Sequence, residues 1–286
     1  MKLTIELNQQ QYKVLVNQPT SIAIDLAFIE ASATEHLTAN KLVQPNHFGA
    51  DYAQASSMKI AQFIGDTRVG GSCNVTQITM NPHCNGTHTE CVGHIVHNPI
   101  SINQTLNDSL IPCTLISVTP TPSQNQSKEQ YDPSIDEGDK LITKQQLMHQ
   151  IQHINNECLT ALVIRTLPNE QSKQRACYSE HNQPPYFTND AIEYLNERGV
   201  THLLVDMPSI DKMFDQGHMS NHHIFWQVAP LARLCGDDTQ LSKSITEMVY
   251  VGNTLEDGLY LLNLQIAPFE LDAAPSRPLL YSLQAI

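Results

Sequence analysis

Residues 83–94 bring together side chains that can bind a metal ion or transfer a proton. This run holds three histidines, two cysteines and one carboxylate within twelve residues: His83-Cys84-Asn85-Gly86-Thr87-His88-Thr89-Glu90-Cys91-Val92-Gly93-His94. Imidazole nitrogens, thiolates and carboxylates are the ligands that zinc and related ions prefer. A solvent-exposed histidine cluster is the alternative, and the regular spacing of the groups favours a metal site.

The residues before this run predict a strand that would position it. Residues 75–80 alternate in character and are rich in β-branched side chains, which is typical of extended backbone. If the extended conformation continues, successive side chains point to opposite faces. Cys84, His88, Glu90 and His94 then share one face. His83 lies on the other face unless a bulge changes the alternation.

Residues 84–94 resemble the signature of the cyclase family of metal-dependent hydrolases, which includes bacterial kynurenine formamidase (arylformamidase) and isatin hydrolase. That signature reads His-x-Gly-Thr-His-x-Asp-x-Pro-x-His, and the Gly-Thr-His core and the last histidine match in register. Cys84 stands where the first histidine is expected, Glu90 replaces the aspartate and Val92 replaces the proline. Further landmarks keep the order of the family as far as about residue 280, namely segment 206–211, a histidine at 222 or 223, Glu247 and segment 272–277.

The resemblance implies an α/β protein with the swivelling β/β/α fold of the family, in which helices flank a mixed sheet. It also implies one domain over residues 1–286 that self-associates as a dimer or tetramer. The implied metal ligands are Cys84, His88, Glu90, His222 and Glu247, and His94 would be the general acid/base. His83 is the alternative to Cys84, and His223 is the alternative to His222.

The implied reaction is hydrolysis of an amide-type bond in a small molecule, as when an arylformamidase converts N-formylkynurenine to kynurenine and formate. One or two divalent ions would support it, and a Cys84 thiolate favours zinc over manganese. Hydrolysis of another cyclic amide or ester is an alternative, and so is a non-catalytic metal-binding or sensing protein. His94 argues against the sensing protein, because a site that only holds metal needs no proton carrier.

Other parts of the chain predict the frame around this site. Helices are expected at 102–106, 144–155 and 189–198, and strands at 3–7, 12–16, 21–26, 113–118, 161–166, 201–206, 244–249 and 258–268. The strand-helix-strand order after residue 161 predicts a parallel pair joined by a crossover helix. Glu247 lies among apolar neighbours, where an unpaired carboxylate would be costly and a metal would remove that cost.

Several smaller features carry weaker expectations. Asn85 and Thr87 are expected to hold ligands in place. His47 and Phe48 line either a substrate entrance or an ordinary loop. His149 and His153 are spaced for metal binding but are expected to be exposed on their helix, and residues 120–139 read as a surface insertion without chemistry.

Composition bounds the class of protein. The 286 residues carry a formal charge of −13, which argues against nucleic acid or an anionic membrane as partner. No apolar run reaches the length of a membrane span, and the first residues do not resemble a secretion signal. Seven cysteines without a framework spacing suggest reduced thiols. A soluble cytoplasmic protein is therefore expected.

Overall fold

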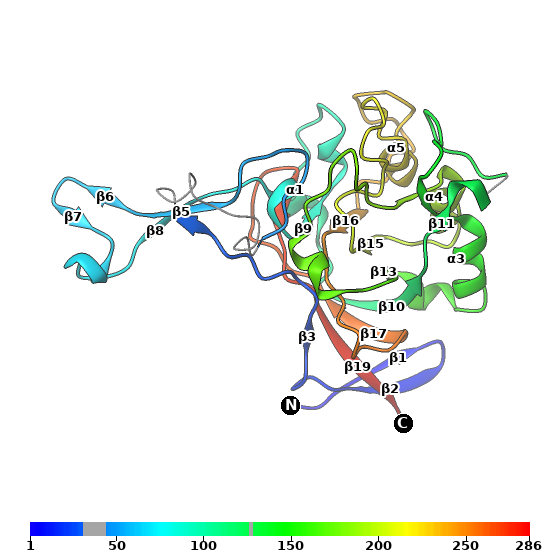
Figure 1. The fold of residues 1–286 in the computed structure, drawn as a ribbon. Helices are drawn as coiled ribbons and strands as arrows, with labels where there is room; N and C mark the ends of the chain where they lie inside the picture. The colour runs from blue at the N-terminus through cyan, green and yellow to red at the C-terminus, as the bar shows by residue number, and fades with distance from the viewer. Residues whose placement is uncertain (31–43, 126–127) are drawn as a thin grey trace.

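A mixed sheet of 11 strands forms the centre of the computed structural model, which describes residues 1–30, 44–125 and 128–286. The strands run in the order β1-β2-β19-β17-β10-β13-β15-β16-β9-β18, with β3 pairing to β19 (Figure 1). Their bounds are β1 Leu3–Leu7, β2 Gln10–Val14, β3 Thr20–Ser21, β9 His88–Glu90, β10 Leu110–Val118, β13 Ala161–Thr166, β15 His202–Val205, β16 Ser244–Glu247, β17 Gly258–Asn263, β18 Ala273–Pro275 and β19 Leu279–Ala285.

Four parallel strands, β10, β13, β15 and β16, make the middle of this sheet. Both faces of β13 are buried: Leu162 packs in the core on one face and Val163 in the core on the other. Strands covered on both faces are expected to be largely apolar, and β10, β13 and β15 are, whereas β16 carries Ser244, Thr246 and Glu247. The predicted strands at 113–118, 161–166 and 201–206 are confirmed, as is the parallel pairing of the last two.

Helices α3 Lys144–Ile151, α4 Asn189–Glu197 and α5 Ser220–Trp226 cover one face of the sheet (Figure 1). A capping box at Thr143 starts α3, and the Thr188 hydroxyl caps α4. Helix α4 stops before Gly199, whose φ of +74° suits glycine. The predicted helix at 189–198 is confirmed, whereas the one at 144–155 ends four residues early. The expected mixed sheet with flanking helices is thus confirmed.

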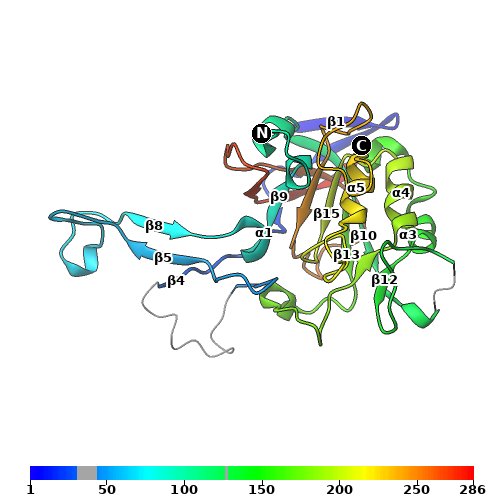
Figure 2. The ribbon, with the colours of Figure 1, turned by 90° about the horizontal axis from the view of Figure 1, so that it is seen from above.

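An arm of short strands extends away from the main sheet (Figure 2). Strand β5 pairs with both β4 and β8, and β6 pairs with β7. A third small sheet has the order β11-β12-β14. The bounds of these elements, with the two remaining short helices, are β4 Ile29–Glu30, β5 Gln54–Ser57, β6 Lys59–Ile60, β7 Phe63–Ile64, β8 Thr76–Thr79, β11 Thr121–Pro122, β12 Lys140–Ile142, β14 Tyr186–Phe187, α1 Pro82–Asn85 and α2 Ile102–Thr105.

Two predicted strands are shorter than expected. The segment 21–26 pairs only at Thr20–Ser21 and through a single bridge from Ala23 to Val249, and the segment 258–268 ends as a strand at Asn263. The chain between 264 and 272 leaves the sheet and returns as β18, which completes the site. Among the described residues, no helix is both long and apolar enough to span a bilayer.

Candidate functional site

Strand β9 sets the spacing of the candidate site because it lies between β16 and β18, antiparallel to both. Its register places His88 opposite Glu247 and Glu90 opposite Ile245. His88 Nε2 is 3.5 Å from Glu247 Oε2, so the pairing joins two predicted ligands that are far apart in sequence. His88 and Glu90 lie two residues apart on one strand and therefore face the same side.

Glu90 is the centre of the cluster and is fully buried. His222 Nε2 lies 3.0 Å from its Oε1. His83 Nδ1 and His94 Nε2 lie 3.1 Å and 3.8 Å from its Oε2, but neither makes a well-aligned hydrogen bond there. Three groups of side chains in the described residues could each hold an ion: His83, His94 and Asp272; His83, His88 and Glu90; and Glu90, His94 and His222.

The short helix α1 decides which residue before Gly86 reaches the cluster. Asn81 caps it through the backbone N–H of His83, and Pro82 occupies its first turn. The expectation that extended backbone runs on through residue 84 is therefore wrong. The turn points His83 at Glu90, whereas Cys84 belongs to none of the three possible ion-binding groups. Burial, and next the nearby Glu247, raise the pKa of the Cys84 thiol.

His222 reaches Glu90 from α5, on the far side of the cluster. Its Nδ1 lies 2.5 Å from Asp211 Oδ2, and its backbone N–H donates to the same oxygen at 3.2 Å. Because Nδ1–H donates to Asp211, Nε2 is the nitrogen that faces Glu90, and it can bind an ion when the ring is neutral. A carboxylate behind a histidine in this way is the usual support of a metal-binding imidazole.

Asp272 supports His83 and His94, the two histidines of the cluster whose side chains are partly exposed. Its Oδ2 is 2.9 Å from His83 Nε2 and 3.2 Å from His94 Nδ1, and the two rings stack with centroids 4.2 Å apart. The side chain of His94 is 25% exposed, while that of Glu90 is 0% exposed. His94 is thus a member of the cluster that a substrate can reach. Sequence reasoning gave Asp272 no role, although it begins segment 272–277.

Glu247 completes the buried side. Its Oε1 accepts the backbone N–H of Ile210 at 3.1 Å and lies 3.8 Å from His222 Nε2. Gly86 contributes its carbonyl oxygen, 3.0 Å from His88 Nδ1, which leaves His88 Nε2 to face Glu247. Two buried carboxylates and the imidazoles of His88 and His222 therefore converge from strands β9 and β16 and helix α5.

The pKa values of the cluster show that its buried carboxylates favour positive charge beside them. Burial alone would raise the pKa of Glu90, but His94, His222 and His83 outweigh it and hold the pKa well below its usual range. Burial likewise opposes protonation of His83, yet Asp272 and Glu90 raise its pKa to about 10. The same balance, against Asp211 and Glu90, raises the pKa of His222. Even so, His88 Nε2 and Glu90 Oε2 are buried without a hydrogen-bond partner.

The two unpaired atoms test whether the residues of the cluster fit a divalent ion, and the residues fit one. Buried polar atoms normally find partners, and exceptions need a reason such as an unseen ion. Here the two unpaired atoms are an imidazole nitrogen and a carboxylate oxygen, both suited to zinc or manganese. Without Cys84 in the set, the donors are nitrogen and oxygen only, which weakens the preference for zinc that a thiolate would give.

The two expected supporting residues are both buried. Thr87 Oγ1 accepts the backbone N–H of Ile24 at 2.8 Å and donates to the carbonyl of Met248, next to Glu247. Asn85 binds the backbone at both ends of its amide, accepting from Asn81 N and donating to Asp51 O. Each side chain therefore fixes backbone beside a candidate ligand.

The remaining histidines lie elsewhere. His223 is buried on α5 and lines a separate cavity of about 450 Å³ with Asn189 and His218. His47 is buried and stacks on Tyr178, while Phe48 is half exposed. Burial, and next His88, lower the pKa of His47 to about 4.

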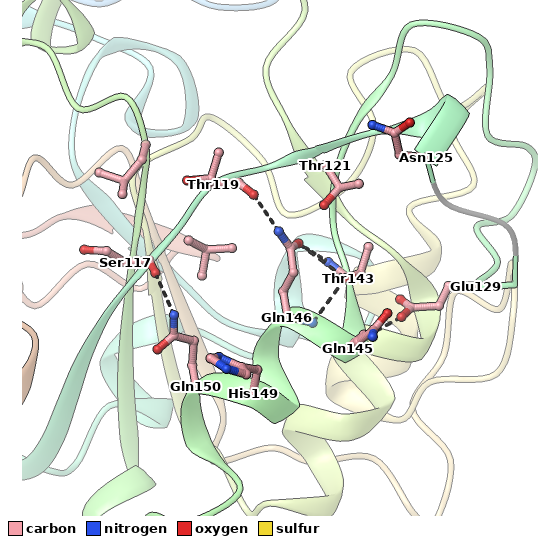
Figure 3. A pocket seen from close by; sticks show the side chains of 12 residues that line it. Ser117, Thr119, Thr121, Asn125, Glu129, Thr143, Gln145, Gln146, His149 and Gln150 are labelled. Carbon is pink, nitrogen blue, oxygen red and sulfur yellow. Dashed lines mark hydrogen bonds between the residues drawn. The ribbon is translucent and has the colours of Figure 1, made fainter.

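His149 and His153 are exposed, as expected. His149 lines a polar cavity of about 520 Å³ with Ser117, Glu129 and Gln150 (Figure 3). Two glutamine side chains of this cavity donate to backbone carbonyls, Gln146 to Thr119 and Gln150 to Ser117. This cavity shares no lining residue with the Glu90 cluster and offers no comparable chemistry.

Comparison with known proteins adds a family and a fold. A family model described as putative cyclase matches residues 1–212. No curated protein sequence matches significantly. A structure described as a predicted metal-dependent hydrolase from Bacillus stearothermophilus has a TM-score of 0.56 and 16% identity, covering 92% of this chain and 98% of that one.

Two isatin hydrolases A are also similar in structure. The one from Labrenzia aggregata, bound to benzyl benzoate, has a TM-score of 0.55 and 14% identity over 94% of this chain and 96% of that chain. The one from Ralstonia solanacearum has a TM-score of 0.53 and 13% identity over 92% of this chain and 91% of that chain. At such identities the likeness concerns the fold, and it confirms the expected cyclase-like architecture.

Proposed function

Because this chain belongs to the cyclase family, we propose that its Glu90 cluster binds one or two divalent ions and hydrolyses an amide-type bond in a small molecule. The observation that carries the proposal is the convergence of His83, His88, His94 and His222 on a fully buried carboxylate. Structural hydrogen bonding does not explain this arrangement, because two of its buried atoms have no partner.

His83, His88, Glu90, His222 and Glu247 are the proposed ligands, with His83 in the place expected for Cys84. A divalent ion bound there would polarise a substrate carbonyl and lower the pKa of bound water. Zinc and manganese both suit the nitrogen and oxygen donors. Neither Cys84 nor Glu247 belongs to the three ion-binding groups, but Glu247 is kept because its carboxylate lies 3.5 Å from His88 Nε2 and 3.8 Å from His222 Nε2, whereas the raised pKa of the Cys84 thiol is the reason to leave Cys84 out.

His94 is the proposed proton carrier. Asp272 accepts from its Nδ1, so that the neutral imidazole presents an unprotonated Nε2 toward the cluster. This nitrogen can take a proton from the attacking water and return it to the leaving nitrogen of an amide. Its partial exposure makes it accessible to substrate, whereas His88 and His222 are enclosed.

The proposed activity is arylformamidase-like, with N-formylkynurenine as the first substrate to try. Hydrolysis of a cyclic amide is the second candidate, and it is favoured by the two isatin hydrolases among the structural neighbours. We also propose that the protein is a homo-oligomer in the cytoplasm. The arm supports self-association, because Ile60, Val69 and Ile78 are exposed on it and a second copy could cover them.

The test measures metal content and turnover on the same anaerobically purified samples. Wild type, His94→Gln and the exposed control His149→Gln are assayed with N-formylkynurenine, isatin and a simple ester. We expect bound zinc or manganese in all three proteins and a loss of about 10²–10⁴-fold in kcat for His94→Gln alone. Equal turnover in His94→Gln would remove its assigned role. Metal without turnover on any substrate would favour a sensing protein, and no metal under any loading condition would refute the proposal.

A further inference from the structure

Residues 129–139 form a strap that lies beside the proposed metal centre. The sequence assigns this part of the 120–139 segment to a surface insertion without chemistry, and most of its residues do lie at the surface, but Tyr131 is an exception. Tyr131 is only 5% exposed and packs with Leu141 and Tyr186 in a small core of its own. A tyrosine buried this deeply needs a partner for its hydroxyl.

That partner is Asp211, the residue that orients His222. The Tyr131 hydroxyl donates to Asp211 Oδ1 at 2.8 Å and accepts the backbone N–H of Lys212 at 3.0 Å. Asp211 Oδ1 also accepts the backbone N–H of Asn221, while its Oδ2 serves His222. The strap thus contacts the proposed ligand through one intermediate side chain.

A second set of contacts, from Lys212 and Tyr186, holds the strap against the rest of the protein near Asp211. Lys212 Nζ, on a side chain that is 4% exposed, lies 2.6 Å from Asp136 Oδ2 and 2.8 Å from Asp139 Oδ2. Tyr186 donates its hydroxyl to the same Asp139 oxygen at 2.6 Å. The side chains of Lys212 and Asp139 are only 4% and 8% exposed, and such a buried pair holds geometry better than a surface pair does, whereas Asp136 is 64% exposed. The strap is therefore held both by Tyr131, which contacts Asp211 directly, and by Asp139, which contacts Lys212 and Tyr186.

We propose that Tyr131 is a positioning residue of the metal centre, whose hydroxyl fixes the Asp211 carboxylate and through it the tautomer and orientation of His222. This inference rests on the proposed function in so far as His222 is a ligand. Its physical basis is that Asp211 is 2% exposed, so the surrounding protein leaves little room for water to replace a lost donor. With one donor fewer, only the backbone N–H of Asn221 still holds Oδ1, so the rotation of the carboxylate that accepts from His222 Nδ1–H is less firmly fixed.

The test compares Tyr131→Phe with Tyr186→Phe. Each removes one buried hydroxyl that joins the strap to the rest of the protein by donating to a carboxylate, Tyr131 to Asp211 and Tyr186 to Asp139, so only the first touches Asp211. Two quantities are measured: the dissociation constant for zinc, by competition with a chelating dye, and the ¹⁵N chemical shifts of the His222 ring in metal-free protein. The second readout does not depend on metal binding or turnover.

We expect Tyr131→Phe to weaken zinc binding by about tenfold, the lower end of the effect of losing such a support. We also expect it to shift the ¹⁵N resonance of His222 Nδ1, because the hydrogen bond from Nδ1–H to Asp211 changes, whereas Tyr186→Phe leaves both quantities near wild type. Equal effects of the two variants would reduce Tyr131 to a general packing role and overturn the inference, as would unchanged His222 shifts. If wild type binds no zinc, the proposed function fails, and the His222 shifts still decide the role of Tyr131.

Discussion

Replacing Glu90 with glutamine should separate metal binding from folding. Glu90 is 0% exposed and lies within 3.8 Å of three histidine rings, so the substitution keeps the volume but removes the central negative charge. Zinc at 100 times its dissociation constant should stabilise wild type by about 2.7 kcal/mol. At roughly 2 °C per kcal/mol for a chain of this size, the midpoint of unfolding should rise by about 5 °C. In Glu90→Gln the rise should vanish.

The assay is thermal unfolding, followed by circular dichroism, with and without added zinc. Glu256→Gln is the matched control, because it makes the same chemical change at an exposed position. Its midpoint should rise as much as that of wild type. If Glu90→Gln still gained the full 5 °C or so, the ion would bind elsewhere, and the assignment of the cluster would be refuted.

Two further predictions concern pH and assembly. Burial, despite the nearby Asp108, lowers the pKa of His202 in the folded state. The unfolded state therefore takes up the proton first, and stability should fall as pH drops below about 6.5. Urea unfolding between pH 5 and 8 should show this slope and its flattening in His202→Gln, and an unchanged slope would contradict it. In analytical ultracentrifugation, the mass of wild type should exceed the 31.9 kDa of one chain. Ile78→Lys, on the arm, should shift the mass toward that of one chain, whereas Met148→Lys, at an exposed position elsewhere, should not. A monomeric wild type would refute self-association.

Much of the fold follows from local sequence signals. Continuous apolar runs predicted the central parallel strands, because strands buried on both faces cannot alternate. Thr188 and Gly199 marked the ends of α4 through capping and a positive φ. The strand predicted at 21–26 was mostly wrong, since Ile22 is buried against the core without ladder pairing along its length. Apolar alternation alone does not tell a paired strand from an extended segment that packs.

The ligand pattern shows where period-two reasoning stops. The alternation from His88 to Glu90 holds because β9 is paired on both sides, and a paired strand keeps its pleat. It fails before Gly86, where Asn81 and Pro82 start a helical turn instead. A turn of helix rotates side chains by about 100° per residue, so His83 faces Glu90 while Cys84 does not. An Asn-Pro pair is a recognisable helix start, and it was the available signal.

Asp272 and Asp211 were beyond local reasoning for a different reason. Asp272 meets His83 across 189 positions of sequence, and such contacts depend on sheet order that no periodicity encodes. Both carboxylates were in segments resembling the family, but nothing in those segments indicated which imidazole each carboxylate would contact. The supporting role of Asp211 and Asp272 becomes apparent only when the structure shows which oxygen accepts from Nδ1 of His222 and of His94.

Charge explains why protons alone do not complete this cluster. Protonating His83 and His222 would balance Glu90, and their raised pKa values express that tendency. Yet His88 Nε2 and Glu90 Oε2 have no hydrogen-bond partner despite that compensation. A single divalent cation could contact both atoms and carry the charge that two imidazolium groups would otherwise supply. Because Asp211 and Asp272 already bind the outer nitrogens of His222 and His94, the inner nitrogens are left to face that charge, and the chain itself thus orients its imidazoles as ligands rather than as counter-ions.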